Sequence, residues 1–131
     1  MKITMLYAGF LALWYVVLSA KVIQGRSGPN AINLGDGGNP KMLRVIRGHA
    51  NFSEYVPLML VIMAMLEYSG TARWLMHAMG GTLLFARVMH GFALSFTDKF
   101  IVGRFLGASL TLFLLVVGGA LCLWLGTKPG Y

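Results

Sequence analysis

Four long apolar runs constrain this chain more than any other feature of its sequence. They cover residues 3–23, 40–68, 72–96 and 104–125. A helix needs about 20 apolar residues to cross a bilayer, so each run is long enough for one crossing. Only 11% of the 131 residues are charged, whereas soluble domains average about 25%. The sequence therefore predicts an all-α integral membrane protein, with residues 1–131 forming one domain built as a bundle of four transmembrane helices.

The segments between the runs indicate how these helices are connected. The first connection, GRSGPNAINLGDGGNP, is rich in Gly and Asn, which favour turns. It ends at Pro40, a residue that suits the first turn of a helix. The next connection, Ser69 to Thr71, is so short that the second and third helices should be antiparallel neighbours. No A-x-A cleavage pattern follows the first run, so we expect it to be a retained helix and not a signal peptide.

Basic side chains gather around the connections that follow the first and third helices. That group comprises Lys21, Arg26, Lys41, Arg44, Arg47, Lys99 and Arg104, whereas Lys2, Arg73 and Lys128 lie at the other side. Because basic loops stay in the cytoplasm, both termini should face away from it in this multi-pass protein. The net charge of +7 is explained by topology and by anionic lipid. We therefore expect membrane lipid as a partner, and no nucleic acid.

The second helix begins with a polar face. At about 100° per residue, its polar side chains share an arc of about 100°, from which His49 points away. The members of this polar seam are Arg44, Arg47, Asn51, Glu54 and Tyr55. Charged groups inside a membrane normally face the protein interior or a polar cavity. Polar residues can also serve only to join helices, and the spacing alone leaves both alternatives open.

The third helix adds Arg87 and His90, which lie on one face and well inside the apolar run. Together with the arginines of the polar seam, they provide more positive charge than Glu54 can neutralise. This excess favours a site for an anionic ligand over a purely structural seam.

The motif R-x-x-R-x-H-x-N-x-x-E-Y-x-P, from Arg44 to Pro57, resembles the signature of the MAPEG family, the membrane-associated proteins of eicosanoid and glutathione metabolism. The GDGG of residues 35–38 is typical of bacterial members, and the FARVMH of residues 85–90 and Arg104 also match. The resemblance implies a homotrimer of four-helix protomers that binds glutathione between adjacent protomers. It also implies a location in the bacterial inner membrane.

The resemblance assigns roles to individual residues. It makes Arg47, Asn51, Glu54 and Tyr55 glutathione ligands and adds a wider candidate set: Arg44, His49, Arg87, His90, Lys21 and Arg26. Arg104 matches an arginine that stabilises the glutathione thiolate, although Lys99 is a possible substitute and Arg104 could be an ordinary flanking cation. A fixed cation lowers the pKa of a nearby thiol, and the thiolate is the nucleophile.

The function that follows is a glutathione-dependent transferase or peroxidase, with a hydrophobic electrophile or lipid hydroperoxide as second substrate. One alternative is a non-catalytic membrane protein that binds glutathione or lipid. Another is a small four-helix exporter, but such proteins need a carboxylate in the first helix, and residues 3–23 contain none. With three histidines and no HxxxH or carboxylate cluster, we expect no metal site.

Overall fold

Four helices form a single bundle in the computed structural model, which describes residues 1–97 and 99–128. They are α1 (Lys2–Gly25), α2 (Pro40–Tyr68), α3 (Arg73–Ser95) and α4 (Ile101–Gly126). The predicted all-α fold is thus confirmed. Asp98 and residues 129–131 of the expected single domain lie outside the described residues. The fourth helix begins at Ile101 and not at Arg104, because the apolar Ile101 and Val102 extend it toward the preceding loop.

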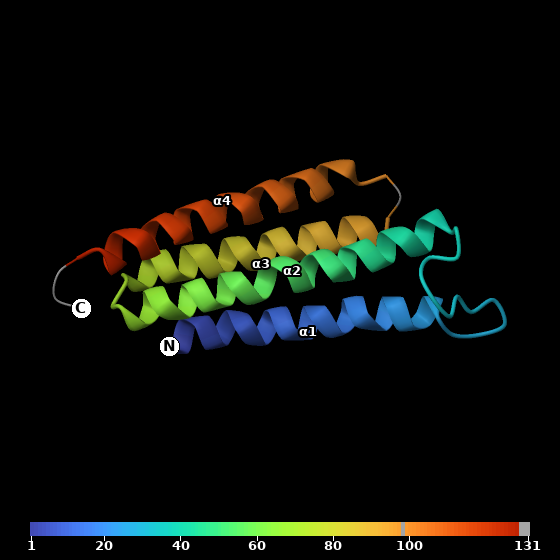
Figure 1. Ribbon diagram of the computed structural model, residues 1–131, viewed down its shortest axis with the longest axis horizontal. Helices are drawn as coiled ribbons and strands as arrows, with labels where there is room; N and C mark the ends of the chain where they lie inside the picture. Colours follow the sequence, from blue (N-terminus) through green and yellow to red (C-terminus); the bar gives the residue numbers. More distant parts are fainter. Residues whose placement is uncertain (98, 129–131) are drawn as a thin grey trace.

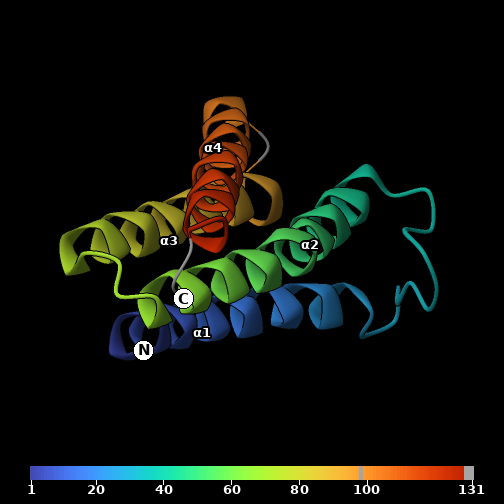
Figure 2. The ribbon, with the colours of Figure 1, turned by 60° about the vertical axis from the view of Figure 1, so that its left-hand side comes forward.

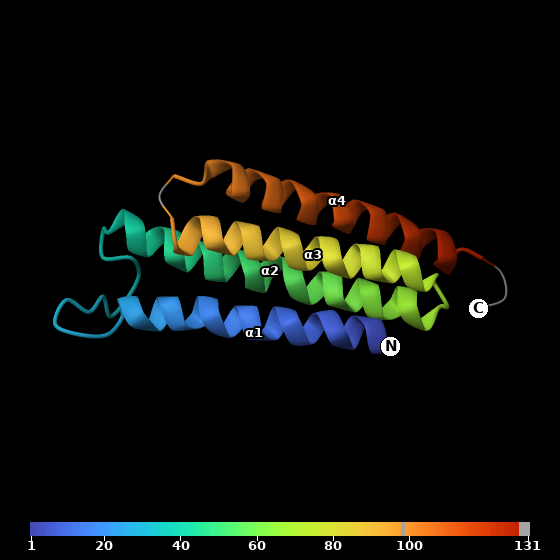
Figure 3. The same cartoon turned by 180° about the vertical axis from the view of Figure 1, so that it is seen from behind.

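The helices run antiparallel to their neighbours in the sequence (Figure 1). Figure 2 shows α1 and α4 on opposite sides of the α2–α3 pair, and the view from behind in Figure 3 agrees. Both outer helices contact α2 and α3, whereas no contact joins α1 to α4 in the described part of the chain. The end with the connection at residues 26–39 is termed the loop end. The opposite end, where α1 starts and α4 ends, is termed the termini end.

Three of the helices, α1, α2 and α4, are long and apolar enough to cross a membrane. The remaining helix, α3, carries Arg87 and His90 on its buried side. It contacts all three other helices, so its polar groups are shielded by protein and not exposed to lipid. The bundle therefore buries the two basic side chains of α3, Arg87 and His90, between its helices.

Both ends of α2 are fixed by local hydrogen bonds. Asn39 Oδ1 accepts from the backbone N–H groups of Lys41 at 2.9 Å and Met42 at 3.3 Å, which caps the helix. At the other end, Gly70 adopts φ +79°, and Thr71 N–H donates to the carbonyl of Leu66 at 3.1 Å. This left-handed glycine cap ends α2 and turns the chain directly into α3.

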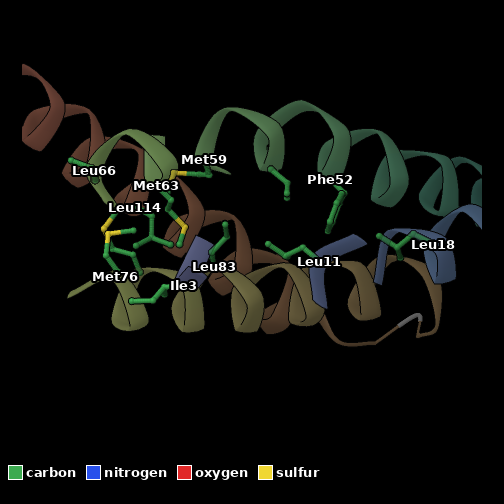
Figure 4. Packing of buried hydrophobic residues seen from close by; sticks show 12 residues of the cluster. Ile3, Leu11, Leu18, Phe52, Met59, Met63, Leu66, Met76, Leu83 and Leu114 are labelled. Atoms are coloured by element: carbon green, nitrogen blue, oxygen red, sulfur yellow. The ribbon is translucent and has the colours of Figure 1, made fainter. Parts of the chain in front are cut away.

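The apolar core extends from the middle of the bundle to the termini end. Met59, Met63, Met76 and Leu83 are completely buried there, and Figure 4 shows their side chains meeting between the helices. Methionine is flexible enough to fill irregular gaps between helices. These side chains hold α2 and α3 together below the region that the polar residues occupy.

An acidic residue closes the termini end of α1. Glu67, near the end of α2, accepts from the backbone N–H of Ile3 at 2.9 Å and from that of Thr4 at 2.8 Å. The first N–H groups of a helix have no partner within it, and a carboxylate is favoured there by the helix dipole. The contact therefore joins the start of α1 to the end of α2.

Candidate functional site

A cavity of about 610 Å³ opens at the loop end between α2, α3 and α4. We term it the arginine pocket, because three arginines from two helices line it. Its lining residues are Leu43, Arg44, Arg47, Asn51, His90, Leu94, Ile101, Arg104, Phe105 and Ala108. The structure thus brings together five residues that the sequence nominated from three separate helices.

The polar seam of α2 is divided between the inside and the outside of the bundle. Arg44 and Asn51 are half-buried at its inner edge, whereas Arg47 and Glu54, two turns apart, are both exposed at its outer edge. Arg47 still lines the arginine pocket, but Glu54 does not. An arc of about 100° is wide enough for its two edges to differ in this way.

Backbone hydrogen bonds anchor the walls of the arginine pocket. Arg44 Nη2 donates to the carbonyl of Thr97, which ties α2 to the end of α3. His90 Nδ1 lies 3.0 Å from the carbonyl oxygen of Arg104. Because a carbonyl oxygen can only accept, Nδ1 carries the hydrogen and the ring is held in one tautomer. This bond fixes the backbone of Arg104 while its side chain remains exposed in the pocket.

Close packing sets the position of His90 against α4. A Cβ added at Gly107 would lie 2.5 Å from the carbonyl oxygen of Ala86 and 2.7 Å from His90 Cβ. Only glycine allows the backbones of α3 and α4 to approach this closely. Of the two glycines in this G-x-x-x-G motif, Gly107 therefore allows the close contact with α3, whereas Gly103 faces the ring of Phe100.

Arg87 is only 1% exposed and does not line the arginine pocket. Its Nη2 donates to Asn51 Oδ1 at 2.8 Å, and its guanidinium lies 6.0 Å from the centre of the Tyr55 ring. Arg87 Nε and Nη1 have no hydrogen-bond partner among the described residues. Because the Asn51 oxygen already accepts from Arg87, the amide NH₂ of Asn51 is the group left to donate into the pocket.

Tyr55 and Arg87 share a separate recess of about 40 Å³. Asn51 and Ala108 line both this recess and the arginine pocket. The predicted ligands Tyr55 and Arg87 therefore lie behind Asn51, one layer deeper than the pocket itself.

Three further candidates lie on other sides of the bundle. His49 faces α1, where Nε2 is 3.1 Å from Ser19 Oγ and the ring stacks on Tyr15. Lys21 lies over the ring of Phe96, and Arg26 Nη1 donates to the carbonyl of Asn33 at 3.5 Å. None of the three lines the arginine pocket of the single chain. The exposed Lys99, the possible substitute for Arg104, does not line it either.

The arginine pocket is strongly cationic and has an apolar rim. None of the described residues that line it is acidic. Leu43, Ile101 and Phe105 at its margin are 45%, 76% and 75% exposed, so the pocket opens on the outer surface of the bundle. These rim residues were not predicted from the sequence, because an apolar side chain beside a pocket has the same sequence signal as one facing lipid.

The four-helix bundle and the arginine pocket are those of a small helical membrane protein with a cationic site between its helices. The model of the MAPEG family matches residues 4–124. The chain belongs to the MAPEG family, and it is an integral protein of the bacterial inner membrane.

Two curated relatives are the inner membrane protein YecN of Escherichia coli strain K12 and the protein of the same name from Escherichia coli O6:H1. Each is 35% identical over 88 residues, which cover 67% of this chain and 66% of the relative. The match thus spans just under two thirds of each relative. No solved structure matches the chain significantly.

Proposed function

We propose that this protein is a glutathione-dependent membrane enzyme, a transferase or peroxidase that ionises the thiol of glutathione. The observation that carries the proposal is the arginine pocket, with three arginines and no acidic residue among its described lining. Its volume lies within the range of about 300–1,000 Å³ typical of small-molecule sites. Glutathione, with two carboxylates and one ammonium group, has the net negative charge that such a pocket requires. Membership of the MAPEG family supports the same ligand.

The pocket residues offer complementary partners for the peptide. Arg47 can bind a carboxylate through two parallel hydrogen bonds, and the NH₂ of Asn51 can donate to a peptide carbonyl or carboxylate. In this proposal Arg87 contributes indirectly, because it holds the Asn51 oxygen at 2.8 Å. The ligand would thus bind with its acceptor groups directed toward α2.

The exposed outer edge of the polar seam favours a homotrimer. Glu54 and Arg47 lie outside the bundle, and an unshielded carboxylate at this position on a membrane helix is unfavourable. A neighbouring protomer would cover both residues and close the open side of the arginine pocket. Glu54 would then be available to accept hydrogen bonds from the glutamyl ammonium.

Arg104 is the proposed thiolate-stabilising residue. It lies in the first turn of α4, and its backbone is anchored by His90 at 3.0 Å. A cation held beside the sulfur favours the thiolate over the thiol. The thiolate can attack an electrophilic carbon and expel its leaving group. It can also attack a hydroperoxide, which gives an alcohol and glutathione sulfenic acid. A second glutathione then converts the sulfenic acid to disulfide and water.

The apolar rim suggests how a second substrate would arrive. Ile101 and Phe105, both exposed, lie beside Arg104 on the surface of α4. A hydrophobic electrophile or lipid hydroperoxide dissolved in the bilayer could reach the sulfur across this rim without entering water. The exporter alternative is weaker, because the described residues of α1 include no carboxylate to carry protons.

The test is a titration of purified protein with glutathione, in which ultraviolet difference absorbance measures the thiolate band. Wild type should give a saturable thiolate signal, which Arg104→Ala removes while equilibrium dialysis still detects bound glutathione. Arg73→Ala, which alters an exposed arginine in the first turn of α3, is the matched control. Binding without a thiolate in wild type would identify a non-catalytic binder, and absence of binding would refute the glutathione proposal.

A further inference from the structure

A second cavity lies at the loop end on a different face of α2. It has a volume of about 430 Å³ and is enclosed by the end of α1, the following connection, the start of α2 and the end of α3. We term it the lysine groove. It is lined by Lys21, Gln24, Gly25, Asn30, Ile32, Asn39, Lys41, Met42, Val45 and Ser95. It shares none of these residues with the arginine pocket.

The lysine groove has an excess of positive charge. Lys21 and Lys41 line it together with three side-chain amides, and none of its described lining residues is acidic. Lys21 is held in place, because its Nζ donates to Gln24 Oε1 at 3.4 Å and lies 4.6 Å from the centre of the Phe96 ring. The two lysines therefore line one cavity, and no carboxylate from the described walls neutralises them.

A buried hydroxyl in the wall also lacks a partner. Ser95, at the end of α3, is 8% exposed, and its Oγ has no hydrogen-bond partner in residues 1–97 and 99–128. Buried polar atoms are nearly always hydrogen-bonded. Because Ser95 lines the groove, an anionic oxygen bound beside it would both accept from this hydroxyl and balance the charge of the two lysines.

The location of the groove indicates the source of this anion. Lys21 lies one turn before the end of α1, and Lys41 is in the first turn of α2, so both mark the boundary between the apolar helices and water. Basic pockets between membrane helices at this depth bind the phosphates of lipid headgroups. Ile32, Met42 and Val45 add apolar surface to the same groove, which suits the glycerol and upper acyl carbons of a lipid.

We infer that the lysine groove binds a phosphate group, supplied by the headgroup of an anionic phospholipid of the surrounding membrane. The phosphate oxygens accept from the ammonium groups of Lys21 and Lys41 and from the hydroxyl of Ser95. Lysine suits this role, since its ammonium is a compact charge that binds phosphate without a fixed geometry. The groove is separate from the proposed glutathione site and does not depend on that proposal.

Native mass spectrometry of the purified full chain with equal amounts of phosphatidylglycerol and phosphatidylethanolamine tests the inference. Wild type should retain phosphatidylglycerol preferentially. The double variant Lys21→Gln, Lys41→Gln should retain it about tenfold less, since charged hydrogen bonds dominate such sites. The control Lys128→Gln removes a lysine that lies over Trp124 at the termini end, and it should retain the lipid as wild type does.

Ser95→Ala keeps every charge, so it provides an alternative test of the groove if the double variant does not fold. It should weaken retention of phosphatidylglycerol by a smaller factor. Equal retention by wild type and both groove variants would overturn the inference. If inorganic phosphate binds through the two lysines and neither lipid is preferred, the groove is a phosphate site, but its ligand is a soluble phosphate and not a lipid headgroup. Displacement of phosphatidylglycerol by glutathione in the Arg47→Ala variant would assign the groove to glutathione and also overturn the inference.

Discussion

The two ends of the bundle are built differently. At the termini end, Met63, Leu66 and Met76 are at most 1% exposed and pack against one another. At the loop end, a cavity of about 610 Å³ that is lined by arginines lies between α2, α3 and α4. One end consists of close apolar packing, whereas the other brings like charges together around open space.

The contrast between the two ends shows how a small membrane protein can carry a polar site. Like charges and cavities both destabilise a bundle, so the loop end requires support from elsewhere. The core of the termini end provides that support, and Arg87 lies at the boundary between the two regions. Stability and ligand binding should therefore depend on different residues, which the following substitutions test.

The largest effect is expected in the core. Leu83→Ala removes a fully buried side chain of α3 and should lower the free energy of unfolding by about 2–3 kcal/mol. This is the lower part of the usual range of ~2–5 kcal/mol, because lipid solvates apolar groups well. Denaturation with sodium dodecyl sulfate in micelles measures it. Leu123→Ala on the exposed face of α4 is the control. An equal loss in the free energy of unfolding in both variants would show that the buried core contributes no more to stability than the exposed surface.

A smaller effect on a different property is expected at the loop end. Arg47 is exposed, so Arg47→Ala should leave unfolding unchanged. It should weaken glutathione binding by about 1.5–3 kcal/mol, the value of a charged hydrogen bond. Isothermal titration calorimetry measures the dissociation constant, with Arg73→Ala as the matched control. A parallel loss of stability in Arg47→Ala would contradict the separation of the two ends.

Arg87→Met tests the boundary between the two ends. Replacing a buried charge with an apolar side chain of similar length should leave the free energy of unfolding unchanged or raise it by about 1 kcal/mol. Glutathione affinity should nevertheless fall about tenfold, because Asn51 loses the bond that orients its amide. Arg87→Lys should restore part of the affinity. Substantial unfolding of Arg87→Met would instead indicate that Arg87 is a structural residue.

The smallest effect is expected at Glu67, which caps α1 from the termini end. Glu67→Gln keeps an oxygen that can accept from one N–H but loses the charge and the second acceptor. Unfolding should therefore become easier by about 0.5–1 kcal/mol. Thermal unfolding detects this change, and Arg73→Ala, at an exposed position of the termini end, is the control. Glutathione binding by Glu67→Gln should match wild type.

The number of helices and the cluster around Arg44 followed from simple patterns. Apolar runs longer than a bilayer crossing predict helices directly, and spacing along one helix predicts which side chains share a face. Arg44, Arg47 and Asn51 indeed line one pocket. Helical spacing did not indicate that Glu54 would lie outside the arginine pocket. The angular position of a residue on its helix does not show how much of the helix surface the neighbouring helices bury.

The side-chain contacts between different helices could not be predicted from the sequence. The bond from Arg87 to Asn51 joins residues on α3 and α2, and the bond from His90 to Arg104 joins α3 and α4. Each depends on the relative depth and rotation of two helices, which no local pattern specifies. The cap formed by Glu67 was missed for the same reason, since its partners are more than sixty positions away in the chain.

The cap also constrains how the protein is assembled during synthesis. Ile3 and Thr4 are synthesised more than sixty residues before Glu67, whose carboxylate satisfies their N–H groups. Until Glu67 has emerged, water must satisfy the first N–H groups of α1. The cap at the start of α1 therefore forms only after the second helix has been made, so the first two helices reach their final contact as a pair.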